Sequence, residues 1–245
     1  KLATEAHARL LETPSVLNYL AKRGLPLEAV QRYGLGYIEG EDNTGKYLYR
    51  QRAAFGLPPK ERDGKPVRTL RIPRGITIPC WSDGDHTQAL RVRIRKRNAD
   101  LAEGEDKYIL IAQPAPPYSA PLRLAPIGVA PELATWAVVE SELDAMLIHH
   151  ACGGKIGALA ILTASGKPDA AAHAALSAAA RILMVMDWDA KPDGDIPTAS
   201  NWRWWRDRYP QAKLWPVPTG KDPGEAFAKG VDIREWLRGG CPASC

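Results

Sequence analysis

The sequence predicts an α/β protein, in which a mostly parallel sheet flanked by helices follows a smaller basic α+β lobe. Three observations support this fold class. From residue 135 onward, short apolar runs alternate with segments of helical composition, an order typical of a parallel sheet with helices on its faces. Two of these apolar runs end in carboxylates. Residues 1–130 carry a net charge of +7, whereas the remainder carries −2.

A helical hairpin is expected at the start of the basic lobe. Its first helix covers 15–23, because Thr13-Pro14 suits the N-cap and first helical position and Gly24 suits the C-terminal cap. Its second helix begins after Leu25-Pro26 and ends before Gly34.

The rest of the basic lobe is expected to be mainly β. Residues 40–75 mix Gly, Pro and charge, and suggest loops and short strands. Strands over 76–81 and 88–97, joined by a turn at 82–85, form a hairpin. Six prolines in 113–132 indicate an irregular connection between two lobes.

The alternating part of the chain follows this connection. We expect, in order, a strand over 136–139, a helix over 142–151, a strand over 158–163, a helix over 168–180, a strand over 182–186, a helix over 197–208, a strand over 213–217 and a closing helix over 233–238. The predicted domains are a basic lobe over 1–130, an α/β domain over 131–228 and a C-terminal helix and tail over 229–245.

Composition limits the class of protein. A hydrophobic content of 45% and a charged content of 25% are ordinary for a soluble domain. No apolar stretch reaches the ~18 residues of a membrane span. The chain begins with Lys1 and has no secretory signal, so we expect a cytoplasmic piece of a longer protein. Four cysteines without a CxxC pair fit a reducing compartment, and Cys241 with Cys245 leave open half of a zinc site.

Acidic side chains follow the ends of predicted strands. The run 182–186 ends on Asp187-Trp188-Asp189, and the run 136–139 ends on Glu140, with Asp144 about one helical turn later. Asp222 follows the next short strand. Because ligands of open α/β sheets bind at the carboxyl ends of strands, these acids predict a site for a hard divalent cation, Mg²⁺ or Mn²⁺. The alternative is that each acid caps a helix; acids at three strand ends favour the metal.

A row of cations marks the second half of the predicted hairpin. Arg91, Arg93, Arg95 and Arg97 alternate with other residues and share one face of a strand, ~6.6 Å apart. This is close to the ~7 Å between phosphates of an extended nucleic-acid strand. Lys107-Tyr108 adds a charge beside a ring that can stack. Contact with nucleic acid or nucleotide is therefore predicted; the alternative is a solvated edge strand protected by charge.

Two weaker signals concern the α/β domain. The turn Ala164-Ser165-Gly166-Lys167 resembles a phosphate-contacting turn at a helix N-terminus, but it lacks the full P-loop pattern. Trp202, Trp204 and Trp205 could form a stacking platform, yet on a helix after the acidic strand they fit core or lobe contact better.

The acids resemble the Toprim pattern, in which one strand ends in Glu and a later strand ends in Asp-x-Asp. Glu140 and Asp187-Trp188-Asp189 match it, Asp144 matches an acid often found one turn after the Glu, and Gly194 lies near the usual glycine. Lys221-Asp222-Pro223 is similar to the Lys-Asp-Pro motif of primase Toprim domains.

The N-terminal half resembles the start of the catalytic core of DnaG-type bacterial primases. The matching segments are 19–25 and 33–37, followed in the same order by the arginine strand and Lys107-Tyr108. The resemblance covers about 12–230. Ser141 and Gly224 depart from it, since the family usually has Gly and an acid there, although Glu225 could replace the acid. These departures suggest a divergent primase from a phage, plasmid or integrated element, without the family's zinc-binding segment.

The resemblance implies a DNA primase core that makes short RNA primers on single-stranded DNA. It implies Glu140, Asp187 and Asp189 as catalytic and metal-binding residues, with Asp144 and Asp222 as further ligands. It implies phosphate contacts from Arg91, Arg93, Arg95, Lys107, Tyr108, Lys167 and Lys221. The expected partners are a single-stranded DNA template, nucleoside triphosphates and a replicative helicase. A Toprim nuclease and a non-catalytic single-strand-binding module are the alternatives.

Overall fold

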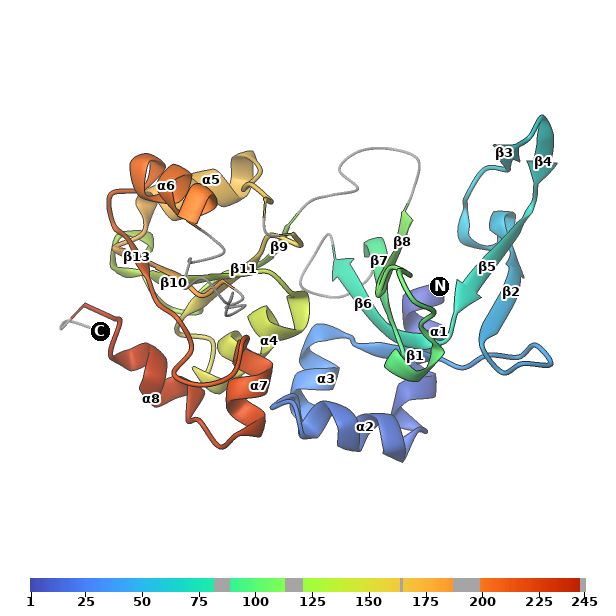
Figure 1. Ribbon diagram of the computed structural model, residues 1–245, viewed down its shortest axis with the longest axis horizontal. Helices are drawn as coiled ribbons and strands as arrows, with labels where there is room; N and C mark the ends of the chain where they lie inside the picture. Colours follow the sequence, from blue (N-terminus) through green and yellow to red (C-terminus); the bar gives the residue numbers. More distant parts are fainter. Residues whose placement is uncertain (82–88, 113–120, 164, 187–198, 243–245) are drawn as a thin grey trace. The chain divides into compact units, whose positions relative to one another are not determined.

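The chain forms two compact units in the computed structural model (Figure 1). The residues described are 1–81, 89–112, 121–163, 165–186 and 199–242. The first unit comprises 1–20 and 26–118, and the second comprises 21–25 and 119–245. The division after residue 118 lies earlier in the chain than the expected boundary at residue 130, and the short segment 21–25 packs with the second unit.

The first unit combines short helices with antiparallel strands. Its helices are α1 (Leu2–Leu11), α2 (Pro14–Ala21), α3 (Leu27–Tyr33), η1 (Arg52–Phe55) and η2 (Asn98–Asp100). Its strands are β1 (Gly36–Ile38), β2 (Tyr47–Gln51), β3 (Lys60–Arg62), β4 (Lys65–Val67), β5 (Thr69–Pro73), β6 (Gly75–Trp81), β7 (Ala89–Lys96) and β8 (Tyr108–Ala112). The expected helical hairpin is confirmed as α2 and α3, whose last turn ends at Gly34 in the left-handed conformation that glycine adopts most easily.

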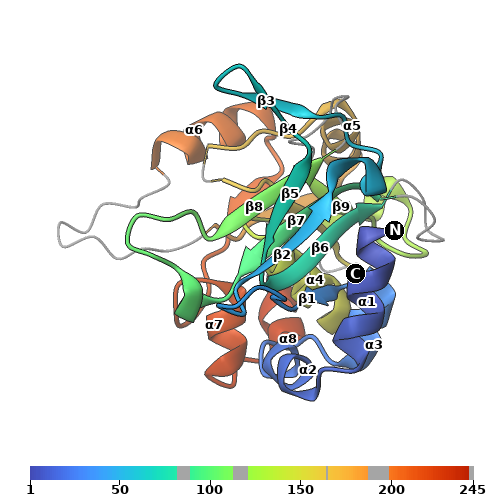
Figure 2. The same ribbon diagram turned by 90° about the vertical axis from the view of Figure 1, so that its right-hand side faces the viewer.

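The main sheet of this unit has the order β1-β6-β7-β8, with every neighbouring pair antiparallel. Figure 2 shows β6, β7 and β8 side by side. The expected hairpin is confirmed as β6 and β7, with Thr77 opposite Ile94. Because β7 lies between β6 and β8, the alternative that the arginine strand is an edge strand is wrong. The pairing of β8 could not be seen in its sequence, since 108–112 is too short to show a period.

Helix α1, which the sequence did not predict, packs on β1 and β6. It buries Leu2, Ala6 and Leu10, which recur at the spacing of one helical face. Gly36 allows this close approach: a Cβ there would lie 2.6 Å from the carbonyl carbon of Ala6. Leu2 and Ala6 join the core of the sheet, together with Ile72 and Ile94.

The second unit contains the alternating strands and helices. Its strands are β9 (Leu122–Leu124), β10 (Thr135–Val139), β11 (Gly157–Ala160), β12 (Arg181–Met184) and β13 (Ala212–Leu214). Its helices are η3 (Pro131–Leu133), α4 (Glu142–Ala151), α5 (Ala170–Ala178), α6 (Ala199–Arg208), α7 (Pro223–Ala228) and α8 (Ile233–Arg238).

The sheet of the second unit has the order β13-β12-β10-β11-β9. The pairs β13–β12, β12–β10 and β10–β11 are parallel, and only β9 runs antiparallel to its neighbour β11. Helices α5 and α6 cover one face, and α4, α7 and α8 cover the other (Figure 1). The prediction of a mostly parallel sheet with helices on both faces is confirmed.

The region 113–132 differs from its predicted irregular character. Its described part contains β9 and η3, and β9 extends the sheet at its edge by pairing with β11. Pro121 and Pro126 lie on either side of β9, so neither proline removes a hydrogen-bond donor from the strand. The proline content therefore limits the length of the strand without preventing it.

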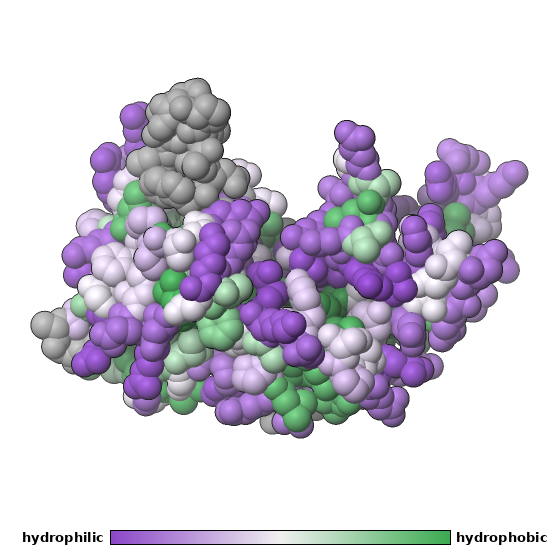
Figure 3. Space-filling model, turned by 60° about the horizontal axis from the view of Figure 1, so that its bottom comes forward, coloured by the Kyte–Doolittle hydropathy of each residue, from purple (hydrophilic) through white to green (hydrophobic). Residues whose placement is uncertain are grey.

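The surface agrees with a water-exposed molecule. Hydrophilic residues cover most of the face drawn in Figure 3, and apolar residues show through in separate patches. Among the residues that the structure describes, no helix combines the length and apolar character needed to cross a bilayer.

Candidate functional site

The carboxyl ends of the parallel strands meet at one edge of the second sheet. Glu140 follows β10 directly, and its carbonyl accepts a hydrogen bond from Leu162 N–H at 3.0 Å, in the loop after β11. On the other side of β10, Val185 N–H donates to the Val138 carbonyl at 2.8 Å. Glu140, the loop after β11 and the end of the β12 segment are therefore neighbours at this edge.

Asp187 and Asp189 lie outside the described residues, as does Gly194. The described chain reaches Met186, whose side chain is buried in the same core as Val138 and Met184. The parallel pairing of β10 and β12 places Val138 opposite Met184. The described chain therefore ends at Met186, directly before Asp187. This segment follows β12, the neighbour of the strand β10 that precedes Glu140.

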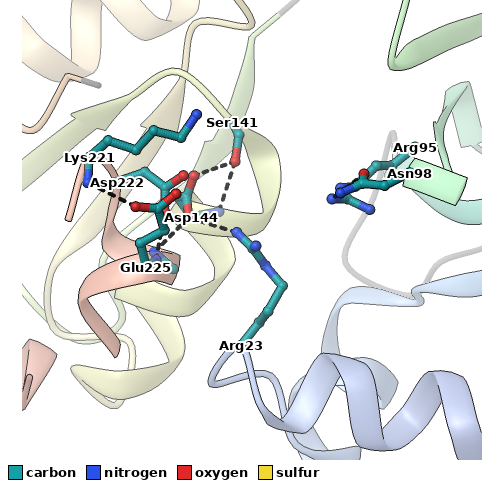
Figure 4. A network of polar contacts seen from close by, with 9 residues as sticks. Arg23, Arg95, Asn98, Ser141, Asp144, Lys221, Asp222 and Glu225 are labelled. Carbon is teal, nitrogen blue, oxygen red and sulfur yellow. Dashed lines mark hydrogen bonds and ion pairs between the residues drawn. The ribbon is translucent and has the colours of Figure 1, made fainter. Parts of the chain in front are cut away.

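Asp144 lies at the centre of a hydrogen-bond network (Figure 4). Ser141 caps α4 by accepting the Asp144 N–H, and the Ser141 hydroxyl donates to the Asp144 carboxylate. Gly224 N–H donates to Asp144 Oδ1 at 3.0 Å, and Arg23 Nη2 lies 3.6 Å from the same oxygen. Ser141, a departure from the family pattern, is therefore accounted for as the N-cap of α4.

Burial and then the neighbouring carboxylate of Asp222 raise the pKa of Asp144 to about 6. Ser141, Arg23 and Gly224 oppose this rise, because each stabilises the ionised carboxylate. Two carboxylates thus share a nearly dry part of the edge, where negative charge is costly unless a cation is close.

The loop that follows β13 carries the Lys221-Asp222-Pro223 motif. Asp222 caps α7 by accepting the Glu225 N–H at 2.7 Å, and Glu225 Oε2 accepts the Lys221 N–H at 3.2 Å. Asp222 is buried, whereas Lys221 is exposed. Figure 4 shows Lys221, Asp222 and Glu225 gathered beside Asp144.

Gly224, the second departure from the family pattern, also has a structural reason. A Cβ at this position would lie 2.3 Å from Arg23 Nη2 and 3.1 Å from Asp144 Oδ1. The arginine from segment 21–25 thus occupies the space that a side chain at position 224 would need. The sequence did not single out Arg23, since a cation at a helix end has no distinguishing pattern.

The donor set suits a hard cation but is incomplete in the described part of the chain. The described residues contain no group of three or more His, Cys, Asp or Glu that could hold a metal ion. They do bring together Asp144 and Asp222, and they place Glu140 at the same sheet edge. Carboxylate oxygens in a poorly solvated position fit Mg²⁺ or Mn²⁺ by their chemistry.

The arginines of β7 are less exposed than a solvated row would be. Arg91 and Arg95 are buried, with 3% and 6% of their surface exposed, and Arg93 is half-buried. The Arg93 guanidinium lies 4.1 Å from the ring centre of Tyr108, so two residues predicted to contact nucleic acid contact each other. Lys107 is exposed beside them.

Arg95 lines a cavity of about 430 Å³ within the first unit. Its guanidinium lies 5.6 Å from the ring centre of Tyr19, and Nη2 donates to Asn98 Oδ1 at 3.2 Å (Figure 4). Arg97 and Tyr37 also line the cavity. A buried guanidinium at the wall of a cavity is an anion site by its chemistry, because its charge needs a partner.

The remaining predicted residues lie in different places. Lys167 contacts Trp204 in the second unit, at 4.0 Å from the ring centre. Trp205 is fully buried, which confirms a core role for it, whereas Trp204 is 36% exposed. Cys245 lies outside the described residues, so the half zinc site with Cys241 stays a prediction. Tyr19 and Asn98 were not predicted, because only the fold brings them to Arg95.

No protein-family model matches the chain, and no curated protein matches it. Solved structures match the chain. The RNA polymerase domain of the Mycobacterium tuberculosis primase DnaG, in complex with double-stranded DNA carrying a 6-nucleotide overhang, is 18% identical, with a TM-score of 0.64 over 97% of this chain and 78% of that chain. A DnaG primase catalytic domain bound to single-stranded DNA is 17% identical, with a TM-score of 0.61 over 98% of this chain and 79% of that chain. A Pseudomonas aeruginosa DNA primase domain is 20% identical, with a TM-score of 0.57 over 91% and 71%. The chain therefore has the fold of the DnaG-type primase catalytic core.

Proposed function

We propose that this protein is the catalytic core of a DNA primase, a metal-dependent RNA polymerase that makes short primers on single-stranded DNA. The observation that carries the proposal is a fold similar to DnaG catalytic domains over 97% of the chain, with Glu140 at the carboxyl end of a parallel strand of the second unit. We further propose that the second unit is a Toprim domain and that the protein is a divergent member, from a phage or another mobile element.

In this proposal Glu140, Asp187 and Asp189 hold Mg²⁺ or Mn²⁺ at the sheet edge. Bound there, the cations would activate the 3′-hydroxyl of the growing primer and neutralise the charge of the incoming triphosphate. Glu140 either ligates a cation or takes a proton from the reacting hydroxyl.

Asp144 and Asp222 have different roles in this proposal. Asp222 is a candidate metal ligand, and Asp144 positions the neighbouring loop. The oxygens of Asp144 already accept hydrogen bonds from Ser141 and Gly224 and lie near Arg23. We propose that Asp144 thereby fixes the loop that carries Lys221, so that this exposed cation stays beside the site. Precise placement matters because phosphoryl transfer depends mainly on positioning and on charge neutralisation.

The first unit would bind the phosphates of template and nucleotide. Arg95 offers a buried charge at a cavity wall, and Arg91, Arg93, Lys107 and Tyr108 lie on the same sheet. Neutralising phosphates releases counterions, so affinity for DNA should fall steeply as salt rises. A template strand and nucleoside triphosphates are the substrates that this activity requires, and a replicative helicase is its proposed partner.

The test is incorporation of labelled ribonucleotides on unprimed single-stranded DNA, with Mg²⁺, with Mn²⁺ and with a chelator. The proposal predicts short RNA products that require both template and metal. The control omits the template. Absence of products with either metal, in protein that still binds DNA, would favour a non-catalytic single-strand-binding module instead.

The same preparation tests the nuclease alternative. DNA is incubated with Mn²⁺ and without nucleotides, and its length is followed on a gel. The proposal predicts intact DNA, whereas metal-dependent shortening that Glu140→Gln abolishes would assign the acidic edge to a nuclease.

A further inference from the structure

A cluster of aromatic and basic residues lies between α5 and α6, which sit side by side on one face of the second sheet (Figure 1). We call it the Trp204 cluster; its members are Lys167, His173, Trp204, Arg208 and Tyr209. His173, Trp204, Arg208 and Tyr209 line a cavity of about 320 Å³ together with 168–170, and Lys167 joins them through its contact with Trp204. None of these residues adjoins Glu140 or Asp144 in the chain, and the proposed chemistry does not use the cavity.

Trp204 is the exposed member of an otherwise buried aromatic group. Its ring contacts the buried ring of Trp205 edge-on, with centroids 5.2 Å apart, and the ring of Tyr209 at 6.2 Å. Trp205 and Tyr209 are 0% and 1% exposed, whereas Trp204 is 36% exposed. The buried rings therefore fix the position of Trp204 and leave part of it open to solvent. A core role explains Trp205 but not the exposure of Trp204.

Two cations lie near this ring, Lys167 over the ring itself and Arg208 one helical turn after it. Lys167 Nζ lies 4.0 Å from the centre of the Trp204 ring, and partial burial lowers its pKa. Arg208 lies one helical turn after Trp204, so both side chains project from the same face of α6. Its Nη2 donates to His173 Nε2 at 3.1 Å, and His173 Nδ1 bonds the Tyr209 hydroxyl at 2.7 Å. The guanidinium is thereby held at the rim of the cavity.

An acid, Asp169, also lines this cavity. Asp169 caps α5 by accepting the Ala172 N–H at 2.8 Å, so its charge is directed at the helix N-terminus, where negative charge is stabilised. Lys167 over the ring and Arg208 one turn along α6 thus place two cations beside an exposed indole.

We propose that the Trp204 cluster binds a segment of single-stranded nucleic acid, with a base stacked on Trp204 and neighbouring phosphates contacted by Lys167 and Arg208. Every base has a flat aromatic face, so a fixed indole between two cations suits such a strand without regard to sequence. Trp204 and Arg208, one turn apart, have Cβ atoms ~5–6 Å apart, so Arg208 can reach the phosphate next to a base that stacks on the ring. Binding requires no catalysis, so this inference does not rest on the proposed function.

The experiment locates the contact with a photoreactive strand. The full chain is irradiated with a single-stranded oligonucleotide that carries a photoreactive thymine analogue, and the adducts are mapped by mass spectrometry. The inference predicts an adduct on the peptide that contains Trp204. Trp204→Leu should lose this adduct and bind the oligonucleotide about fivefold or more weakly, because stacking contributes ~1 kcal/mol or more per base. Trp204→Phe should retain most of the affinity.

A charge series tests the phosphate contacts. Lys167→Gln with Arg208→Gln should lower the slope of log affinity against log salt by about 1.4, the value for two single-strand phosphates. The matched control is Lys155→Gln with Lys229→Gln. It removes two exposed cations that follow α4 and α7, the helices on the other face of the sheet. This control should keep the slope and the adduct.

Adducts only on other peptides, or affinity of both Trp204→Leu and Trp204→Phe within twofold of the parent, would overturn the inference. A protein as the true occupant of the cluster would give that outcome. Thermal unfolding of each variant checks the fold, and the salt slope of Lys167→Gln with Arg208→Gln carries the test if Trp204→Leu unfolds. Glu140→Gln separates the two proposals, because it should abolish primer synthesis and keep the adduct. An adduct without primer synthesis by the parent would contradict the proposed function alone.

Discussion

The two larger sheets of the described structure carry their charges in different ways. In the first unit, antiparallel β7 presents arginines at every second position, so cations spread along one face. In the second unit, parallel strands bring the ends of distant segments to one edge, where Glu140 follows β10, and the carboxylates of Asp144 and Asp222 lie close to each other. A line of cations suits the phosphates of a polymer, and a group of acids suits a cation. A single substitution at the acidic edge of the second sheet should therefore cause a large loss of activity. A single substitution on the arginine face of β7 should cause a smaller loss of binding.

The largest effect is expected from Glu140→Gln at the sheet edge. The amide keeps the shape of the side chain but removes the charge of the proposed metal ligand, and a bound metal ion is worth several kcal/mol in phosphoryl transfer. Primer synthesis should fall at least about a hundredfold. The control is Glu132→Gln, an exposed acid before β10 at the opposite end of the strand. Equal losses in both variants would mean that the edge has no special role.

A smaller effect is expected from Arg95→Gln on the arginine face. The variant removes a buried cation from the cavity wall while leaving its neighbours in place. Affinity for single-stranded DNA or nucleotide, measured by fluorescence anisotropy, should fall about tenfold, the value of one charge-assisted hydrogen bond. Arg62→Gln in the exposed strand β3 is the control. If Arg95→Gln binds as tightly as the control, the cavity is not part of the phosphate path.

The Asp144 carboxyl should make the folding stability of the protein depend on pH. Its folded-state pKa of about 6 exceeds its ordinary value, so the folded protein binds the proton more tightly than the unfolded chain. Its contribution to stability is therefore greatest at low pH and falls as pH rises from about 4 to about 6.

Asp144→Asn removes this titration and still offers an oxygen to Gly224. The free energy of unfolding in urea, measured with a chelator, should lose the corresponding slope between pH 4 and 6 relative to the parent. A parent-minus-variant difference that does not change with pH would show that the carboxyl is solvated in the folded protein.

The smallest effect is expected from Gly224→Ala. The methyl group would displace the Arg23 guanidinium from Asp144, and the loss of this contact should cost about 1 kcal/mol of stability. Gly239→Ala is the matched control, because its Cβ would meet its nearest neighbour at 3.5 Å, an ordinary contact. Equal unfolding free energies for the two variants would mean that Arg23 does not stabilise the loop.

Local patterns in the sequence predict some elements of this fold and miss others. The β6–β7 hairpin and the alternation from β10 to β13 follow from local patterns: period-two charge in one case, and apolar runs separated by helical segments in the other. Glu140 was placed correctly at a sheet edge because its position depends only on the end of its own strand. Helix α1 was missed, since its apolar face is small and is buried only because the chain approaches Gly36 closely in the folded protein.

Contacts between distant segments explain the other differences. Arg23 reaches Asp144 from the other end of the chain, and no local pattern records that approach. Tyr19 and Arg95 meet for the same reason. The arginine row was expected to face solvent or a strand of nucleic acid. Arg93 contacts Tyr108 of the neighbouring strand β8, and Arg95 contacts Tyr19 of α2, so the burial of the row depends on segments outside the arginine strand.

The most direct test of the central claim concerns the two acids that follow β12. Asp187→Ala with Asp189→Ala is compared with the parent for primer synthesis on unprimed single-stranded DNA in Mg²⁺, and for Mn²⁺ binding by calorimetry. The account predicts that the double variant folds and binds DNA but loses both synthesis and the metal. Undiminished synthesis by the double variant would contradict it.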